Sequence, residues 1–271
     1  MSFCFAFRST DAALLSVALQ RYETVLSFDD GAPNGWGLGY FQGGQPLLRK
    51  QPRLSGRLDF NEKAKNLRSR LLLGHRRGGA TTPIATENTH PFRFHSWIFC
   101  HAGTVDHFDA IRDDILSAIP DFIRRNLRGK TDSEHLFHLF LAFLNDTGKL
   151  DENEVSGAAA GRALHAAIVY IDRLVRDRDG TPPPLCCMLT NGRVLLATRR
   201  GMPMWVTRQS GYETPSKVPG EKPTAHTHLK TVMLVGGVDL EDEPGWEAAE
   251  ENAIVSVDGQ LNIEYSTPSE E

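Results

Sequence analysis

Three stretches of the sequence place turn-forming residues beside side chains that can bind or stabilise charge. They are His75-Arg76-Arg77, the loop at residues 88–92 and the segment His101-Ala102-Gly103-Thr104. A guanidinium can hold a carboxylate through two parallel hydrogen bonds, and a backbone N–H can stabilise a developing negative charge. Ser2 adds a hydroxyl group at the start of an apolar stretch. We expect these segments to form one site.

The elements that must position this site occur as blocks of strands and helices. Residues 3–7 are apolar at every position, which is typical of a strand buried on both faces. Further strands are predicted at residues 36–41, 46–50, 71–73, 96–100, 185–189, 194–198, 231–235, 253–257 and 261–265. Helices are predicted at residues 10–26, 61–70, 106–119, 120–128, 131–144 and 157–175. Because strands and helices do not alternate strictly, the pattern indicates an α+β fold with helices packed outside the sheets.

Local signals define some of these boundaries. The segment Thr131-Asp132-Ser133-Glu134 is a capping box and predicts a helix start at this position. Asn191-Gly192 between two apolar runs predicts a hairpin. Residues 210–228 combine prolines, glycines and charges, so we expect them to be the least ordered stretch.

The order and spacing of the motifs resemble those of the class II glutamine amidotransferases. These N-terminal-nucleophile enzymes release ammonia from glutamine, and the resemblance is strongest to small stand-alone members that hydrolyse γ-glutamyl amides. The matching motifs are Asn34-Gly35-Trp36-Gly37, His75-Arg76-Arg77, residues 88–92, residues 101–104, residues 131–134, residues 189–192 and residues 196–199. The resemblance implies a four-layer αββα sandwich, the N-terminal nucleophile hydrolase fold, as a single domain over residues 1–271.

Two positions depart from the family pattern where its chemistry needs a particular residue. Ser2 stands where the family has its nucleophilic cysteine, and Ala102 stands where the family has the asparagine of its oxyanion hole. A hydroxyl is almost entirely un-ionised near neutral pH, so it is a weaker nucleophile than a thiol. The backbone N–H of Gly103 remains as a donor. Cys4 is a conceivable substitute nucleophile, but it has no α-amine of its own, and we favour a buried thiol.

The residues that would bind the substrate are better retained. By resemblance, Arg77 would hold the α-carboxylate of glutamine and Asp132 its α-amine. Trp36 and Gly37 would form the floor and wall beside the nucleophile. Taken without the resemblance, Arg77 is a solvated basic turn and Asp132 a favourable charge in the first turn of a helix. His90, which we also place at the pocket, is expected to be a hydrogen-bonded core histidine.

Composition excludes several other classes of protein. A net charge of −4 with 24% charged residues gives no basic excess for nucleic acid, and no apolar run is long enough to cross a membrane. The four cysteines show no Cys-x-x-Cys spacing, which favours buried, reduced thiols in a cytoplasmic protein. His226 with His228, and His135 with His138, lack a convincing third ligand, so we expect no metal and no cofactor.

Two functional hypotheses follow. The first is a pseudoenzyme that keeps part of the pocket for glutamine or a γ-glutamyl amide, has lost most or all catalysis, and acts by binding or regulation, with a possible protein partner. The second is an active amidohydrolase that uses Ser2, exposed by removal of Met1, as its N-terminal nucleophile. The oligomeric state is not indicated by the sequence.

Overall fold

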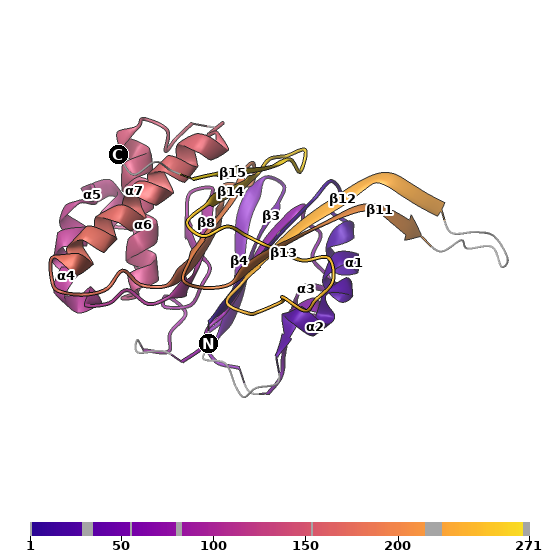
Figure 1. The fold of residues 1–271 in the computed structure, drawn as a ribbon, viewed down its shortest axis with the longest axis horizontal. Coiled ribbons are helices and arrows are strands. Elements are labelled where there is room, and N and C mark those ends of the chain that lie inside the picture. The colour runs from indigo at the N-terminus through magenta and orange to yellow at the C-terminus, as the bar shows by residue number, and fades with distance from the viewer. Residues whose placement is uncertain are drawn as a thin grey trace.

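The computed structural model describes residues 2–28, 35–54, 56–79, 83–152, 154–214 and 224–267. In these ranges two antiparallel sheets pack face to face, and helices cover both outer faces (Figure 1). The predicted αββα sandwich is therefore confirmed.

The first sheet has the strand order β13-β11-β12-β1-β6-β3-β4. Its strands are β1 (Phe3–Ser9), β3 (Trp36–Gln42), β4 (Gln45–Gln51), β6 (Leu71–Arg76), β11 (Met204–Thr214), β12 (Thr224–Gly236) and β13 (Glu247–Ala248). Three short helices cover its outer face: α1 (Leu14–Arg21), α2 (Glu23–Leu26) and α3 (Phe60–Ala64). A small separate ladder joins β2 (Ser27–Phe28) to β5 (Leu58–Asp59).

The second sheet has the strand order β15-β14-β10-β9-β8-β7. Its strands are β7 (Phe92–Phe94), β8 (Trp97–Gly103), β9 (Leu185–Thr190), β10 (Leu195–Arg200), β14 (Ile254–Val257) and β15 (Ile263–Ser266). The helices on its outer side are α4 (Phe108–Ser117), α5 (Asp121–Arg124), α6 (Asp132–Asp146) and α7 (Gly157–Arg176).

Strand β1 shows why an apolar run forms the centre of this sandwich. All seven of its residues are buried, and the sequence predicted this for residues 3–7. Phe5 and Phe7 point outward into the core shared with α1 to α3, whereas Cys4 and Ala6 point inward into the core between the sheets. Because successive side chains of a strand point to opposite faces, residues 3–7 are apolar at every position, whereas the buried Arg8 and Ser9 at the end of the strand donate hydrogen bonds to backbone oxygens.

The capping box at the start of α6 forms with one change. Thr131 Oγ1 accepts a hydrogen bond from Glu134 N at 3.1 Å, as expected. The Glu134 carboxylate does not accept the backbone N–H of Thr131, which would be the second bond of a capping box. It accepts the N–H groups of Arg128 and Gly129, at 3.0 and 2.6 Å, and so holds the turn that precedes α6.

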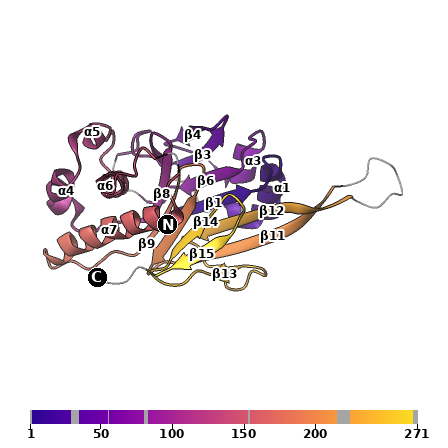
Figure 2. The same cartoon turned by 90° about the horizontal axis from the view of Figure 1, so that it is seen from above.

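Several predictions of local structure need correction. The helices predicted at residues 61–70 and 120–128 end at Ala64 and Arg124. The helix predicted at residues 10–26 is interrupted at Tyr22, whose backbone leaves the helical region and whose ring packs against Trp246 at 5.3 Å. The stretch at 210–228 is in part ordered strand. β11 and β12 extend beyond the body of the protein as a two-stranded arm (Figures 1 and 2), while residues 215–223 lie outside the described residues. The regular pairing of backbone groups along the arm overrides the polar composition.

None of the helices in the described part of the chain is both long and apolar enough to cross a membrane.

Candidate active site

A cavity of about 540 Å³ opens where the start of β1, the ends of β6 and β8, and the first turns of α4 and α6 meet. Ser2, Arg77, Gly103 and Asp132 all line this cavity. Residues distant in sequence are brought together because β1 lies beside β6 in one sheet, with Phe3 opposite Arg76. The same register puts Ser2 at the end of β6 that leads into Arg77.

Ser2 presents its hydroxyl at the edge of the sandwich. Its Oγ accepts a hydrogen bond from the backbone N–H of Gly78 at 3.3 Å, so the serine is tied to the turn that carries Arg77. An N–H donor cannot take the hydroxyl proton. Activation of this oxygen therefore requires a base other than the group that contacts it.

Ala102 is fully buried and belongs to the core between the two sheets. On β8, Phe99 points toward the helices, whereas Cys100 and Ala102 point toward the other sheet. Position 102 contributes a methyl group that cannot donate a hydrogen bond, and Ala102 is not among the residues that line the cavity. The neighbouring Gly103 does line it.

Gly103 adopts a backbone conformation that favours glycine, with φ of +143°. A Cβ atom at this position would lie 2.6 Å from the carbonyl oxygen of Pro184 and 2.7 Å from His101 Nε2. Both distances are too short for real atoms. The turn that brings the backbone of residue 103 to the cavity therefore depends on the absence of a side chain.

Arg77 and Asp132 provide opposite charges on the same cavity. Arg77 is 6% exposed, and burial lowers its pKa while the carboxylate of Asp132 raises it. Its backbone N–H donates to Gly35 O at 2.9 Å. Asp132 Oδ2 accepts the N–H of Val105 at 2.7 Å, and Oδ1 accepts the N–H of Ser133 at 2.7 Å. The carboxylate is thereby fixed in orientation at the start of α6.

Three histidines form the inner wall of the cavity. His75 Nε2 lies 3.1 Å from His101 O, so this nitrogen carries the proton and donates to the carbonyl. The His75 and His90 rings lie 4.0 Å apart. His90 lines the cavity as expected, but neither of its ring nitrogens has a hydrogen-bond partner among the described residues. The prediction of a hydrogen-bonded His90 is therefore wrong, because its ring packs on His75 and Phe92 instead.

Burial keeps these three histidines and His138 of α6 neutral, and it makes stability depend on pH. Burial lowers the pKa of His75 to about 3 and of His138 to about 4, and it lowers the pKa of His90 and His101. In the unfolded chain each would take up a proton below its ordinary pKa of about 6.5. Acid therefore favours the unfolded state, by about 1.4 kcal/mol per pH unit for each such histidine.

We expect the free energy of unfolding to fall from pH 6.5 to pH 5, as measured by urea titration at each pH. Glu134 acts in the opposite direction, because burial raises its pKa, but it is one group against several. A free energy of unfolding that stays constant over this range would show that the histidines are hydrated in the folded protein.

Trp36 and Gly37 lie outside the lining of the cavity. Trp36 Nε1 donates to Gln51 Oε1 at 3.2 Å, and the indole packs against Phe60. A Cβ atom on Gly37 would lie 2.1 Å from His90 O. In the structure, Gly37 supports the loop that carries His90.

Substitution Gly37→Ala is therefore expected to destabilise the protein by roughly 3 kcal/mol or more, because backbone atoms must move apart to admit a methyl group. Thermal unfolding would measure the change. Gly43→Ala is the matched control within the same hairpin, because no atom lies within 4 Å of a Cβ there, although its φ of +58° adds some strain. Equal losses of stability in Gly37→Ala and Gly43→Ala would show that close packing against His90 O is not the cause.

One wall of the cavity was not predicted from the sequence. Residues 107–110, at the start of α4, and Lys130, before α6, also line it. His107 has a left-handed backbone with φ of +50° and precedes the helix without a side-chain cap. No local sequence signal marks these residues as pocket residues. They reach the cavity because α4 packs beside α6.

The cysteines take no part in this cavity. All four are buried and free, as predicted. Cys4 Sγ lies 3.7 Å from Cys186 Sγ between the sheets, and its interaction with Cys186 together with burial raises the pKa of the Cys4 thiol well above its usual range. This placement supports the interpretation of Cys4 as a core residue.

The two stacked antiparallel sheets, with helices outside them and a cavity at the start of a central strand, define an N-terminal nucleophile hydrolase type of sandwich. The family described as "Glutamine amidotransferases class-II" matches residues 1–271. The chain belongs to this family.

Individual relatives agree with this assignment. The chain is 24% identical over 275 residues to the probable glutamine amidotransferase DUG3 of Saccharomyces cerevisiae, covering 90% of this chain and 76% of the relative. A glutamine aminotransferase class-II domain protein from Silicibacter pomeroyi superposes with a TM-score of 0.62 at 20% identity, covering 98% of both chains. The glutamine phosphoribosylpyrophosphate amidotransferase of B. subtilis gives 0.55 at 11% identity, covering 99% of this chain and 50% of the other. At these identities, the two structures support the fold alone.

Proposed function

We propose that this class II glutamine amidotransferase-like protein binds glutamine or a γ-glutamyl amide without efficient turnover, and that it acts through binding or regulation. Its cavity keeps the charged residues suited to an α-amino acid. It lacks two groups on which amide hydrolysis in this family depends.

The observation that carries the proposal is the position of Ala102. Its methyl group is fully buried between the sheets, so of the two oxyanion donors that the family resemblance implies, the backbone N–H of Gly103 remains. Loss of one oxyanion donor costs about 3 to 4 kcal/mol of transition-state stabilisation, or a factor of about 10² to 10³ in rate. The oxyanion hole would thus be reduced to half of its donors.

The nucleophile supports the same conclusion. Ser2 Oγ contacts the N–H of Gly78, which is a donor. His75, on the same cavity, has a pKa of about 3 because of burial, and its Nε2 already donates to a carbonyl. Activation of the hydroxyl would then rest on the α-amine of residue 2, as the family resemblance implies. Because the nucleophile and the oxyanion hole act on one step, their two penalties do not simply multiply.

The pocket itself supports ligand binding. Arg77 and Asp132 face one cavity, and their opposite charges suit the α-carboxylate and α-ammonium groups of an amino acid. A volume of about 540 Å³ lies within the usual range of small-molecule sites. Isothermal titration calorimetry with glutamine tests this part of the proposal, and absence of binding at millimolar glutamine would refute it.

The second candidate is an active amidohydrolase with Ser2 as its N-terminal residue. The observation that favours it is that Ser2 and Gly103 line the same cavity. Intact mass spectrometry of the purified protein tests its first requirement. If Met1 is retained, the α-amine of Ser2 is part of a peptide bond and this mechanism is excluded.

A further inference from the structure

A second hollow lies on the outer side of the second sheet, beside α7. This groove has a volume of about 1070 Å³ and is bounded by α7 and by residues of β9, β10 and β14, with Thr267 following β15. It shares no residue with the cavity of Ser2. Nothing in the proposed catalytic or ligand-binding role uses it.

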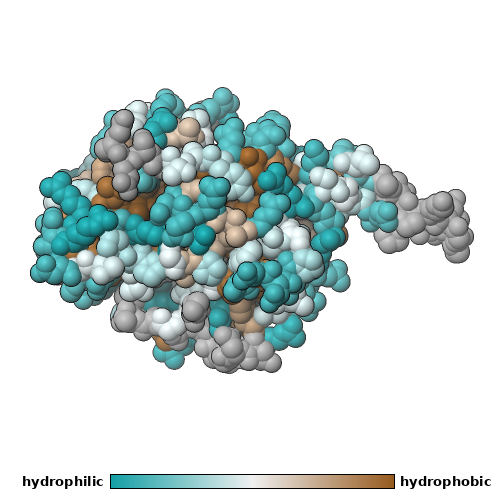
Figure 3. Space-filling view, in the orientation of Figure 1, coloured by the Kyte–Doolittle hydropathy of each residue, from teal (hydrophilic) through white to brown (hydrophobic). Residues whose placement is uncertain are grey.

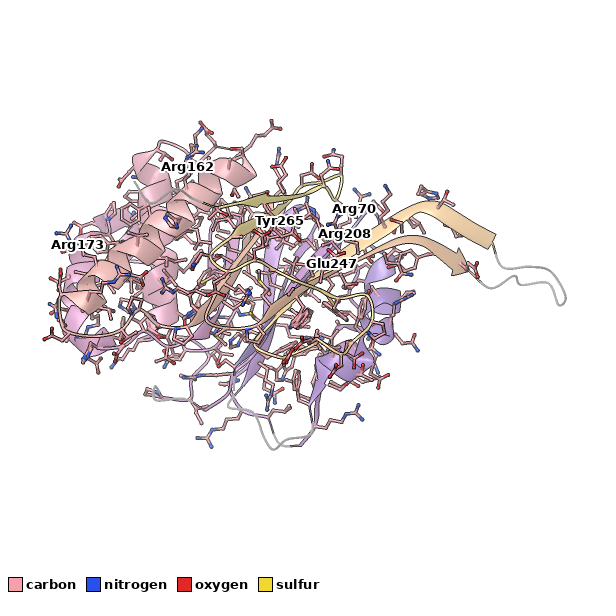
Figure 4. All side chains as sticks on the ribbon, in the orientation of Figure 1. Arg70, Arg162, Arg173, Arg208, Glu247 and Tyr265 are labelled. Atoms are coloured by element: carbon pink, nitrogen blue, oxygen red, sulfur yellow. The ribbon has the colours of Figure 1, made fainter. Side chains whose placement is uncertain are left out.

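The exposed charges of α7 are all arginines. The helix carries four charged residues, and Asp172 is turned inward, where it forms a two-pronged ion pair with Arg200. Arg162, Arg173 and Arg176 are exposed. Figure 4 shows Arg162 and Arg173 toward opposite ends of α7. Arg173 and Arg176 lie three residues apart, on one face of the helix, and both line the groove.

These arginines are poorly neutralised. Among the described residues, Arg162 and Arg176 have no ion pair, and Arg173 has only the exposed Asp177 at 3.9 Å. This concentration of positive charge stands on a protein with a net charge of −4. Such a local reversal of sign favours an acidic partner through complementary charge.

An apolar surface adjoins the charges. Val169 is 47% exposed and lies one turn before Arg173, and the half-buried Phe143 and Tyr170 line the groove beside it. Figure 3 shows hydrophobic patches among hydrophilic atoms along the line of α7. The groove therefore offers contacts for apolar side chains next to contacts for carboxylates.

The arrangement of charge also distinguishes among occupants. In a two-fold antiparallel contact through Val169, Arg162 of one copy would face Arg176 of the other, because both lie seven residues from Val169. Like charges disfavour that contact. Arg199 and Arg200 also line the groove, but they are paired with Glu251 and Asp172. A nucleic acid or an anionic membrane would therefore meet two weakly paired arginines in the groove of a molecule with a net charge of −4, and neither fills a groove with an apolar floor.

We propose that this groove is the docking site for an acidic, amphipathic segment of a partner protein. Its carboxylates bind Arg173 and Arg176, and its apolar side chains cover Val169 and Phe143. The inference extends the proposed regulatory role by specifying the partner's chemistry. It is independent of glutamine binding, which calorimetry tests separately at the Ser2 cavity.

The test is a selection of random dodecapeptides displayed on phage against the full-length protein, followed by fluorescence anisotropy of the enriched peptides. The expected result is enrichment of peptides that combine Glu or Asp with apolar residues. The double variant Arg173→Glu with Arg176→Glu should weaken their binding by about tenfold or more. Arg125→Glu is the matched control, since this exposed arginine at the end of α5 does not line the groove.

A charge-swap experiment distinguishes loss of charge complementarity from loss of folding as the cause of weaker peptide binding. Peptides in which Lys replaces the acidic residues should bind the double variant better than the unmodified protein. The proposal is overturned if no peptides are enriched, if the enriched peptides are not acidic, or if both arginine changes leave their affinity unaltered. Binding to phosphatidylserine vesicles or to single-stranded RNA in place of peptides, lost in the double variant, would assign the groove to a polyanion and overturn it as well.

Discussion

The unmodified protein is expected to release ammonia from glutamine at least about 10²-fold more slowly than ordinary enzyme rates of about 1 to 10³ per second. The reason is that a serine replaces the thiol and a methyl group replaces one oxyanion donor in the same step. A coupled glutamate dehydrogenase assay measures ammonia release directly. Turnover of the unmodified protein at ordinary enzyme rates would disprove the pseudoenzyme proposal.

The double substitution Ser2→Cys with Ala102→Asn is expected to raise this rate by about 10² or more, because it restores both the nucleophile and the second donor. Either change alone should restore much less, since the two groups serve one transition state. Ser2→Ala with Ala102→Asn is the matched control without a nucleophile. If this control matches the restored variant, the ammonia has another origin.

The position of Ala102 sets a condition on that experiment. An asparagine there must place its amide toward the cavity, since an amide left among Cys100, Cys186 and the other core residues would be an unsatisfied polar group. Such a group costs about 1 to 3 kcal/mol of stability. Thermal unfolding of the variant, measured beside its activity, separates a misfolded protein from an inactive one.

Removal of the guanidinium in Arg77→Ala is expected to weaken glutamine binding by about 10- to 10²-fold. A hydrogen bond between charged groups contributes about 1.5 to 3 kcal/mol, and the deletion also leaves Asp132 without its balancing charge. Isothermal titration calorimetry provides the measurement. The glutamine affinity of Arg77→Lys should lie between those of the unmodified protein and Arg77→Ala, because an ammonium group keeps the charge without the planar fork.

Arg68→Ala is the control for Arg77→Ala, since Arg68 is an exposed arginine outside the cavity. It should leave glutamine affinity unchanged. Equal affinity of the unmodified protein and Arg77→Ala would show that the carboxylate binds elsewhere, and the assignment of Arg77 would then be withdrawn.

The two kinds of substitution bear on different parts of the proposal. Ser2 and Ala102 concern the reaction, whereas Arg77 and Asp132 concern the ligand. A protein that binds glutamine through Arg77 but gains turnover only in the double variant would have the properties proposed here. Loss of ligand binding would leave the family and the fold unaffected, because they rest on the match over residues 1–271 and on the sandwich.

Several features of this protein were determined by the sequence itself. The apolar run of β1 predicted a central strand, and Thr131 predicted the start of α6 to the residue. The resemblance to the family predicted from the sequence that Ser2 and Ala102 stand where the family has a cysteine and an asparagine. These properties are local, because side-chain alternation and capping bonds involve residues only a few positions apart.

Other features were decided only by the tertiary structure. Ser2 and Gly78, 76 residues apart, meet because β1 pairs with β6. Gly37 supports His90 instead of lining the cavity, and the start of α4 supplies a wall that no motif indicated. The groove beside α7 likewise exists because β14 and β10 bring their residues to that helix. The physical reason is that sheet register and helix packing join segments distant in the chain, and these contacts decide which side chains share a cavity.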